Sequence, residues 1–317
     1  MSENVLQCQD VRHWYGPKLV LHNVNITIAR GQIVGLVGPS GCGKSTLLRA
    51  ILGTHPPSDG KVVVYKPGEP LGEVVTTPGR DRGIVYQRYA LFPFLTTREN
   101  VAIGPKLDET SIPGRLAGAF TWWKDLRKQH LAEADALLEK VGLGDAIHRY
   151  PHELSGGMRQ RVAIAQALIM KPSILLLDEP FGALDEATRE ELQLLLLSLY
   201  EDNCNAKANG DLPPYTILIV THELTEALYV GDRVLGLSQY WDWKAAGLSE
   251  SPGATIVYDK PAPVYAPGQV KRFEEFVAQR EEIRRLVFEP SELVVPGEHL
   301  TFWELAKAGQ VDGVLGS

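Results

Sequence analysis

The sequence predicts an α/β fold in which helices cover both faces of a mostly parallel sheet. Short apolar segments that suit buried strands alternate along the chain with longer amphipathic segments. The segment at 32–37 is almost wholly apolar, as a strand buried on both faces should be. It runs directly into a glycine-rich turn and a helix, an order that is typical of doubly wound sheets.

Composition places the chain among ordinary globular proteins. Its 317 residues are 44% apolar and 22% charged, which suits one large α/β domain with appendages. Acidic residues outnumber basic ones by 39 to 32, and the net charge is −7. A nucleic-acid binder normally carries a basic stripe that neutralises phosphates, so we expect no nucleic-acid partner.

No apolar run approaches the length that crosses a bilayer. The most apolar stretch, 192–199, is short and follows Glu190 and Glu191, which favours a buried helix. The first residues lack the basic and apolar regions of a signal peptide, and the three cysteines lack metal-ligand spacing. We therefore expect a soluble protein of a reducing compartment that reaches a membrane only through a partner.

Strands and helices are expected in a regular order. Candidate strands occupy 5–11, 24–28, 32–37, 61–65, 83–87, 173–178 and 216–220. Helices are expected from Lys44, across 97–140 with breaks at prolines, after Ser155, over 186–201 and from Glu223. The polar stretch 202–214 suits a surface loop. Beyond Ser238 we expect a strand near 254–259 and an amphipathic helix within 269–288.

A phosphate-binding loop follows the strand at 32–37. Residues 38–45 read GPSGCGKS, the G-x-x-x-x-G-K-[ST] pattern, and a helix comes next. Glycines let successive backbone N–H groups surround phosphate oxygens, while the helix end and the Lys44 ammonium neutralise the β and γ charges. Ser45 is expected to bind Mg²⁺, and Cys42 is interpreted as a small turn residue, not a nucleophile. The expected nucleotide-binding residues here are Gly38, Pro39, Ser40, Gly41, Cys42, Gly43, Lys44, Ser45 and Thr46.

Two carboxylates, Asp178 and Glu179, end the apolar strand at 173–178. They are therefore expected at the carboxyl edge of the sheet, where folds of this kind bind ligands. Asp178 can hold Mg²⁺ through water, and Glu179 can polarise the attacking water as a general base. Acids at a strand end are commonly just solvated. The phosphate loop in the same chain makes the catalytic interpretation the stronger one.

The segment LSGGMRQR at 154–161 resembles the signature sequence of ATP-binding-cassette (ABC) ATPases, and it precedes the acidic strand as in that family. The resemblance covers about 5–237. It implies an ABC cassette, a P-loop NTPase with a RecA-like, mostly parallel core, an antiparallel β subdomain and an inserted helical subdomain. We expect the cassette over 1–237, its helical subdomain at about 90–165, and a C-terminal appendage over 238–317.

The resemblance also implies roles for four further residues. Gln87 matches the Q-loop glutamine, expected beside the metal and the reacting phosphate, and His222 matches the switch histidine near the γ-phosphate. Asp185, in ALD, matches the D-loop. Tyr15 matches the aromatic residue that stacks on adenine, and the neighbouring Trp14 is the alternative.

The signature segment has its own physical logic. Ser155 suits a helix N-cap, and Gly156 and Gly157 leave backbone N–H groups accessible at the helix N-terminus, which favours an anion. The family resemblance implies that this site faces the γ-phosphate held by a second cassette. Two ATP molecules would then lie between two subunits, and a single chain would carry half-sites. Met158 stands where glutamine is more common, which weakens the expectation of a ribose contact.

Three segments together resemble the nitrate/sulfonate/taurine importer subfamily: PGRDRGIVYQ (78–87), LFPFLTTREN (91–100) and YPHELSGGMRQRVAIAQAL (150–168). The resemblance implies ATP and Mg²⁺ as cofactors and a place at the cytoplasmic face of the inner or plasma membrane. The implied partners are a second cassette, permease subunits and a solute-binding protein. The transported solute would be small and often anionic. The alternative function is a soluble ABC ATPase that acts on a macromolecule without a membrane partner.

A cluster of apolar side chains directly after Gln87 is expected to receive a coupling helix of the permease; packing within the helical subdomain is the alternative. Its members are Leu91, Phe92, Phe94 and Leu95. Three other segments, 115–130, the loop 202–214 and the tail from about 288, look like additions to the subfamily. For the first we favour packing on its own subdomain over a brace against the membrane partner. The tail suits a regulatory or dimer-contact appendage.

Overall fold

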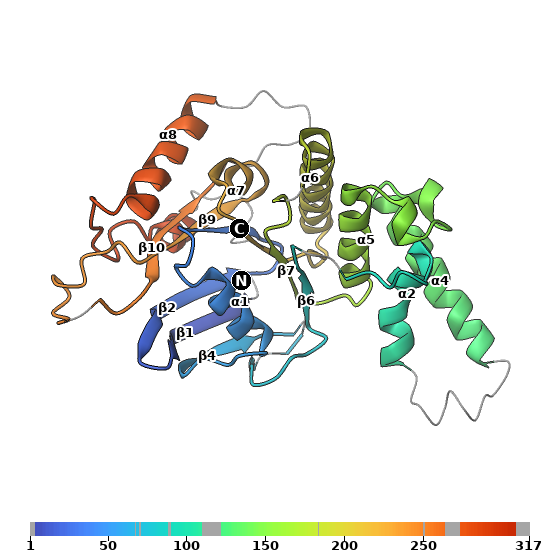
Figure 1. The fold of residues 1–317 in the computed structure, drawn as a ribbon, viewed down its shortest axis with the longest axis horizontal. Helices are drawn as coiled ribbons and strands as arrows, with labels where there is room; N and C mark the ends of the chain where they lie inside the picture. Colours follow the sequence, from blue (N-terminus) through green and yellow to red (C-terminus); the bar gives the residue numbers. More distant parts are fainter. Residues whose placement is uncertain are drawn as a thin grey trace.

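The computed structural model describes residues 4–308 except 67, 70, 88–89, 110–121, 183, 250 and 264–272, and only the backbone of 122–124. It contains two sheets and surrounding helices, which confirms the α/β prediction (Figure 1). Among the described helices, none combines the length and the apolar character that crossing a bilayer demands.

A six-stranded sheet forms the centre of the molecule, in the order β10-β9-β3-β8-β7-β6. All neighbours run parallel except β10, which pairs antiparallel with β9 at the edge. The central strands β3 and β8 are buried along their whole length, which explains their uninterrupted apolar sequences. The strands are β3 (Ile33–Val37), β6 (Arg82–Val85), β7 (Ile174–Asp178), β8 (Ile217–Val220), β9 (Arg233–Ser238) and β10 (Thr255–Pro261).

The second sheet is antiparallel, as expected, in the order β2-β1-β4-β5. Its inward side chains share one hydrophobic core with the helix α1 (Lys44–Leu52) and with one face of the central sheet. This packing holds the start of α1 against the central sheet. The strands are β1 (Asn4–Tyr15), β2 (Lys18–Ala29), β4 (Asp59–Val64) and β5 (Glu73–Val74).

The helical subdomain lies to one side of the central sheet (Figure 1). It comprises α2 (Thr97–Asp108), α4 (Trp122–Lys140) and α5 (Gly156–Leu168), with short 3-10 turns at Gly144–Ala146 and Pro151–Glu153. The buried amide of Asn100 accepts from the N–H of Phe92 and donates to the carbonyls of Phe92 and Leu95, which anchors the preceding loop to α2. Residues 115–121 of the predicted added segment lie outside the described residues.

The remaining helices flank the central sheet. They are α6 (Glu186–Ala208), α7 (Leu224–Val230), α8 (Phe273–Ile283), which continues as a π-helix over Arg284–Phe288, and α9 (Phe302–Lys307). The helix predicted from Glu223 and the strand predicted near 254–259 are confirmed as α7 and β10. The strand β9 was not predicted. It lies between β3 and β10, so the C-terminal strand β10 belongs to the same sheet. A domain boundary at 237/238 stays a prediction.

The surface loop predicted at 202–214 is wrong in its first half, because α6 continues to Ala208. The buried side-chain amide of Asn203 donates to the carbonyls of Gly31 (3.0 Å) and Tyr215 (2.7 Å) and accepts from the Tyr215 N–H (2.9 Å). Asp202 also pairs with Lys140 of α4. These contacts come from distant parts of the chain, so local polarity did not indicate a helix.

One fully buried guanidinium joins the C-terminal segment to the sheet. Arg233 of β9 donates to both carboxylate oxygens of Asp259 on β10, each at 2.6 Å, and to the carbonyl of Thr27 at 2.7 Å. Its guanidinium carbon lies 4.1 Å from the centre of the Phe302 ring and 5.2 Å from that of Trp303. The tail therefore covers a buried ion pair.

Removing the carboxylate of this pair is expected to destabilise the fold. In Asp259→Asn the buried guanidinium loses its counter-charge, and the loss should be about 3 kcal/mol in urea unfolding. The matched control is Glu73→Gln, which breaks the exposed pair with Lys66 and should leave stability unchanged. Equal stability of both variants would contradict this assignment.

Candidate nucleotide-binding site

Three parallel strands end at the same edge of the central sheet. The register places Val220 of β8 between Leu36 of β3 and Asp178 of β7. Beyond this line the Glu179 N–H donates to the carbonyl of Val220 (2.8 Å), and the Thr221 N–H donates to that of Leu36 (3.1 Å). The segments that follow the three strands, which carry the phosphate loop, the two acids and the histidine, therefore meet at this edge.

The phosphate loop needs its glycines for two different reasons. A Cβ on Gly38 would lie 2.1 Å from the carbonyl oxygen of Leu237, so no side chain fits there. Gly41 and Gly43 have φ of 78° and 107°, which side chains rarely adopt. Gly41 has open space around its Cβ position, so an incoming ligand can approach its backbone closely.

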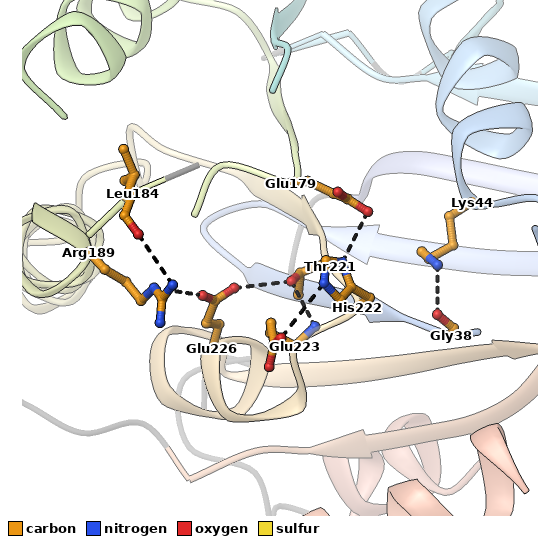
Figure 2. Close-up of polar contacts among 9 residues, drawn as sticks. All are labelled: Gly38, Lys44, Glu179, Leu184, Arg189, Thr221, His222, Glu223 and Glu226. Atoms are coloured by element: carbon orange, nitrogen blue, oxygen red, sulfur yellow. Dashed lines mark hydrogen bonds and ion pairs between the residues drawn. The ribbon is translucent and has the colours of Figure 1, made fainter. Parts of the chain in front are cut away.

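Lys44 begins α1 and turns back over the loop. Its ammonium donates to the carbonyl of Gly38 at 2.6 Å (Figure 2). It also donates to the carbonyl of Pro39 at 3.0 Å, and the residue is only 7% exposed. Cys42 is buried beside it, and burial raises the pKa of the thiol against the lowering effect of Lys44. The site thus combines a preplaced cation with an unreactive thiol.

The two acids after β7 differ in environment. Burial, followed by the neighbouring Glu179, raises the pKa of Asp178, and the cations of Arg49 and Lys44 oppose that rise. Glu179 has a left-handed backbone (φ 47°), a strained conformation for a non-glycine residue. Its Oε1 lies 3.2 Å from Nδ1 of His222 (Figure 2). The structure therefore brings the proposed base and the predicted switch histidine into direct contact.

Gln87 approaches the same acid from the end of β6. A Cβ built on Gly182 would lie 3.1 Å from Nε2 of Gln87 and 3.9 Å from Oε2 of Glu179. The amide and the carboxylate thus border the same glycine. A Cβ at position 182 would crowd the Gln87 amide.

Tyr15 ends β1 with 44% of its surface exposed, and its ring packs edge-on against that of His13, with centroids 4.9 Å apart. Trp14 is 38% exposed. Both rings are accessible, so adenine stacking by Tyr15 stays a prediction, with Trp14 as the alternative.

The signature segment is joined to α6. Ser155 caps α5 by accepting from the Met158 N–H at 3.2 Å, and Gly156 opens the helix. Gly157 packs against Thr188 of α6 so closely that a Cβ would lie 1.8 Å from its methyl carbon. Among the described residues, no hydrogen bond links Ser155 to the phosphate loop.

Asp185 caps α6 in the same way. Its carboxylate accepts from the Thr188 N–H (2.9 Å) and from the Thr188 hydroxyl (3.1 Å), and these bonds lower the pKa of Asp185. Thr188 therefore contacts both the D-loop residue and the signature glycine. The N-terminal ends of α5 and α6 form one unit.

Three polar residues behind His222 were not predicted. Glu226 of α7 accepts from the Thr221 hydroxyl at 3.1 Å and lies 3.4 Å from Nε of Arg189 (Figure 2). It is 5% exposed, and burial raises its pKa to about 7. The available signal was an acid four residues after His222 in the otherwise apolar helix LTEALYV.

The donors at this edge fit Mg²⁺ bound together with a nucleotide. Asp178 and Ser45 offer oxygen atoms, the ligands that Mg²⁺ prefers. Within the described ranges no three His, Cys, Asp or Glu residues form a self-sufficient metal cluster. Such a cluster is not needed, because Mg²⁺ in nucleotide sites takes most of its ligands from phosphates and water.

The contact between the signature segment and α6 predicts a paired effect of two substitutions. Gly157→Ala should clash with the Thr188 methyl and reduce both stability and ATP turnover. Adding Thr188→Ser removes that methyl, retains the hydroxyl on Asp185 and should restore most of the loss. Thermal unfolding and phosphate release measure the two effects. If the double variant is no more stable and no more active than Gly157→Ala alone, the packing argument is wrong.

Comparison with known proteins places this geometry in a family. A family model described as ABC transporter matches residues 21–182. The bicarbonate transport ATP-binding protein CmpD of Synechocystis sp. is 42% identical over 221 residues, covering 69% of this chain and 68% of that protein. The taurine import ATP-binding protein TauB of Escherichia coli O157:H7 is 35% identical over 296 residues, covering 91% and 99%.

Two further similarities agree with these. The nitrate import ATP-binding protein NrtD of Synechococcus elongatus is 40% identical over 246 residues, covering 78% of this chain and 77% of that protein. The solved post-hydrolysis dimer of the ATP-binding cassette MJ0796, bound to ADP and Pi, has a TM-score of 0.57 and 27% identity, covering 82% and 100%. The chain is therefore a member of the ABC transporter family, as an ATP-binding cassette.

Proposed function

We propose that the chain binds and hydrolyses ATP to drive an importer of a small anionic solute. The observation that carries this proposal is the convergence of Lys44, Asp178, Glu179, Gln87 and His222 at one edge of the sheet. The relatives are named for nitrate, bicarbonate and taurine, three small solutes that carry an anionic group. None of these names supports the alternative of a soluble ABC ATPase acting on a macromolecule.

Hydrolysis in this proposal depends on Glu179 as general base. A water held between its carboxylate and the γ-phosphate gives up a proton to the carboxylate as its oxygen bonds to phosphorus. The bond from phosphorus to the bridging oxygen breaks, and ADP leaves. His222, 3.2 Å away, orients that carboxylate and contacts the γ-phosphate. The Lys44 ammonium and the N–H groups of the loop stabilise the charge that develops on the transferred phosphoryl group.

Asp178, Ser45 and Gln87 are the residues proposed to hold Mg²⁺. The ion would neutralise β- and γ-phosphate charge. Two observations support this assignment. The side chains offer oxygen atoms, and Asp178 lies close enough to the phosphate loop for Lys44 to affect its pKa.

The second half of each site is proposed to come from another cassette. Ser155 is exposed at the N-terminus of α5, where Gly156 and Gly157 present backbone N–H groups. The solved MJ0796 cassette is a dimer. In a head-to-tail pair the signature segment of one cassette would face the ATP of the other, and Asp185 would lie at the same interface.

A pocket of about 220 Å³ on the helical subdomain is the proposed contact with the permease. Apolar side chains of Phe94, Leu95, Ile103 and Leu131 line it, together with charged residues such as Glu99 and Arg127. Phe94 is 71% exposed, and it follows Gln87 by a short stretch of chain. A permease helix seated there would sense movement of the glutamine. This docking would hold the cassette at the cytoplasmic face of the membrane, where an associated binding protein would select the solute.

The general base has a direct test. Glu179→Gln should retain ATP binding and lose turnover by at least about a hundredfold, because removal of a general base typically costs that much or more. The matched control is Glu223→Gln, whose carboxylate lies 3.7 Å from the other nitrogen of His222 and should matter little. Phosphate release and binding of a fluorescent ATP analogue measure the two effects. Wild-type turnover in the first variant would remove Glu179 as the base.

The docking pocket is tested by a matched pair of exposed apolar residues. Phe94→Asp should abolish co-purification with the permease while leaving the ATPase rate of the isolated cassette unchanged. Leu71→Asp changes a residue that is 82% exposed and outside the pocket, and should leave co-purification intact. If both variants bind the permease equally well, the pocket is not its docking site.

A further inference from the structure

We infer that Glu226 and Arg189 are positioning residues for the hydrolysis step, acting through Thr221 on His222. The inference rests on the proposed function of the site and assigns roles to residues outside it. The residues Arg189, Glu226 and Thr221 are called the relay below. The relay links the first turns of α6 and α7 to the loop that carries the switch histidine (Figure 2).

The first half of the relay fixes the turn around His222. The Thr221 hydroxyl donates to Oε2 of Glu226 at 3.1 Å and accepts from the Glu223 N–H at 3.0 Å. Thr221 precedes His222 in the chain, and Glu223 and Glu226 follow it, so these two bonds close the turn around the histidine. Thr221 is 2% exposed and its backbone N–H is already bonded to β3. The side chain of Glu226 therefore holds the turn from which His222 reaches Glu179.

The second half of the relay connects this turn to α6. Nε of Arg189 lies 3.4 Å from Oε1 of Glu226, and Nη2 donates to the carbonyl of Leu184 at 3.4 Å. Leu184 directly precedes Asp185, the N-cap of α6. One guanidinium thus holds the D-loop backbone and the carboxylate behind the histidine at the same time. A shift of either is transmitted to the other.

The charge of Glu226 is not what packing alone would select. Its helix is apolar on the buried face, and a buried ion pair is often no more stable than well-packed apolar side chains. Burial removes water from the carboxylate and so disfavours its charged form, which raises the pKa of Glu226 to about 7. The contacts of the Glu226 carboxylate with Thr221 and Arg189 explain its presence at this buried position. The groups that face it are Thr221, His222 and Glu223 before α7 and Arg189 of α6.

The test compares Glu226→Gln with wild-type protein, with each rate divided by the number of ATP-binding sites titrated with a fluorescent analogue. At pH 8 the variant should lose about tenfold in kcat, a barrier change typical of broken coupling between neighbours. Its KM for ATP should stay within about twofold, because the relay does not touch the nucleotide. The control Glu292→Gln breaks an ion pair with Arg285 outside the site and should not change kcat.

Dependence on pH separates positioning from general destabilisation. Glu226 holds Arg189 only when ionised, so the ratio of wild-type to variant kcat should grow from near one at pH 6 to about tenfold at pH 8. Arg189→Gln should lose the same factor, and the double variant no more than either single one. If Glu226→Gln does not fold, Arg189→Gln carries the test alone, through its own ratio to the wild-type rate across this pH range.

Three results would overturn the relay: a wild-type kcat at pH 8 in Glu226→Gln, a ratio that does not change with pH, or additive losses in the double variant. In the event that Glu226→Gln does not fold, a wild-type kcat in Arg189→Gln or a pH-independent ratio overturns it equally.

Failure of the proposed function has a different outcome. In that case the wild-type protein releases no phosphate from ATP, even as a cassette pair with its permease. A wild-type protein that is active, with variants that are equally active, removes the relay and leaves the proposed function intact.

Discussion

The parallel register of β3, β8 and β7 is the constraint on which the site depends. Because Leu36, Val220 and Asp178 stand in line across the sheet, the segments beyond them have to emerge at one edge. Each segment then needs only a short excursion to place a cation, two acids and a histidine together. The hydrogen bonds of Glu179 and Thr221 to neighbouring strands extend this alignment beyond the last regular pairs. Burial of both central strands makes a register slip costly, and the geometry of the site is therefore inherited from the core.

The signature segment is positioned by its packing against α6, and not by a contact with the phosphate loop. Thr188 contacts Gly157 with its methyl group and Asp185 with its hydroxyl, so α5 and α6 present their N-termini as one surface. That surface and the phosphate loop belong to different parts of the chain, joined through α6 and the relay. In the proposed head-to-tail pair these two surfaces would act as separate half-sites, each with its own structural support.

Sequence predicted the parts of the site that follow apolar strands, because a strand end and its next few residues are local features. Lys44, Asp178 and Glu179 were placed in this way and His222 by its match to the family, and the structure brings all four to one edge. The relay was not predicted, since the ion pair between Arg189 and Glu226 joins two helices, and the one local signal, an acid in the helix LTEALYV, does not identify its partner. The same reason applies to Asn203, whose bonds to Gly31 and Tyr215 extend α6 into a polar segment. The strand β9 was missed because Arg233, Gly236 and Ser238 interrupt its apolar sequence, although all six of its residues are buried.

The cover over Arg233 has a consequence for how the protein is made. The guanidinium sits on β9, its carboxylate follows 26 residues later, and the rings of Phe302 and Trp303 come later still. During synthesis β9 is therefore available to join β3 before Asp259 can pair with the Arg233 cation and before the two rings can cover it. The nucleotide site is encoded entirely upstream of that point. A ribosome-bound chain would thus hold the whole catalytic edge while its sheet is incomplete, and the sheet can be completed only after the C-terminal segment has emerged.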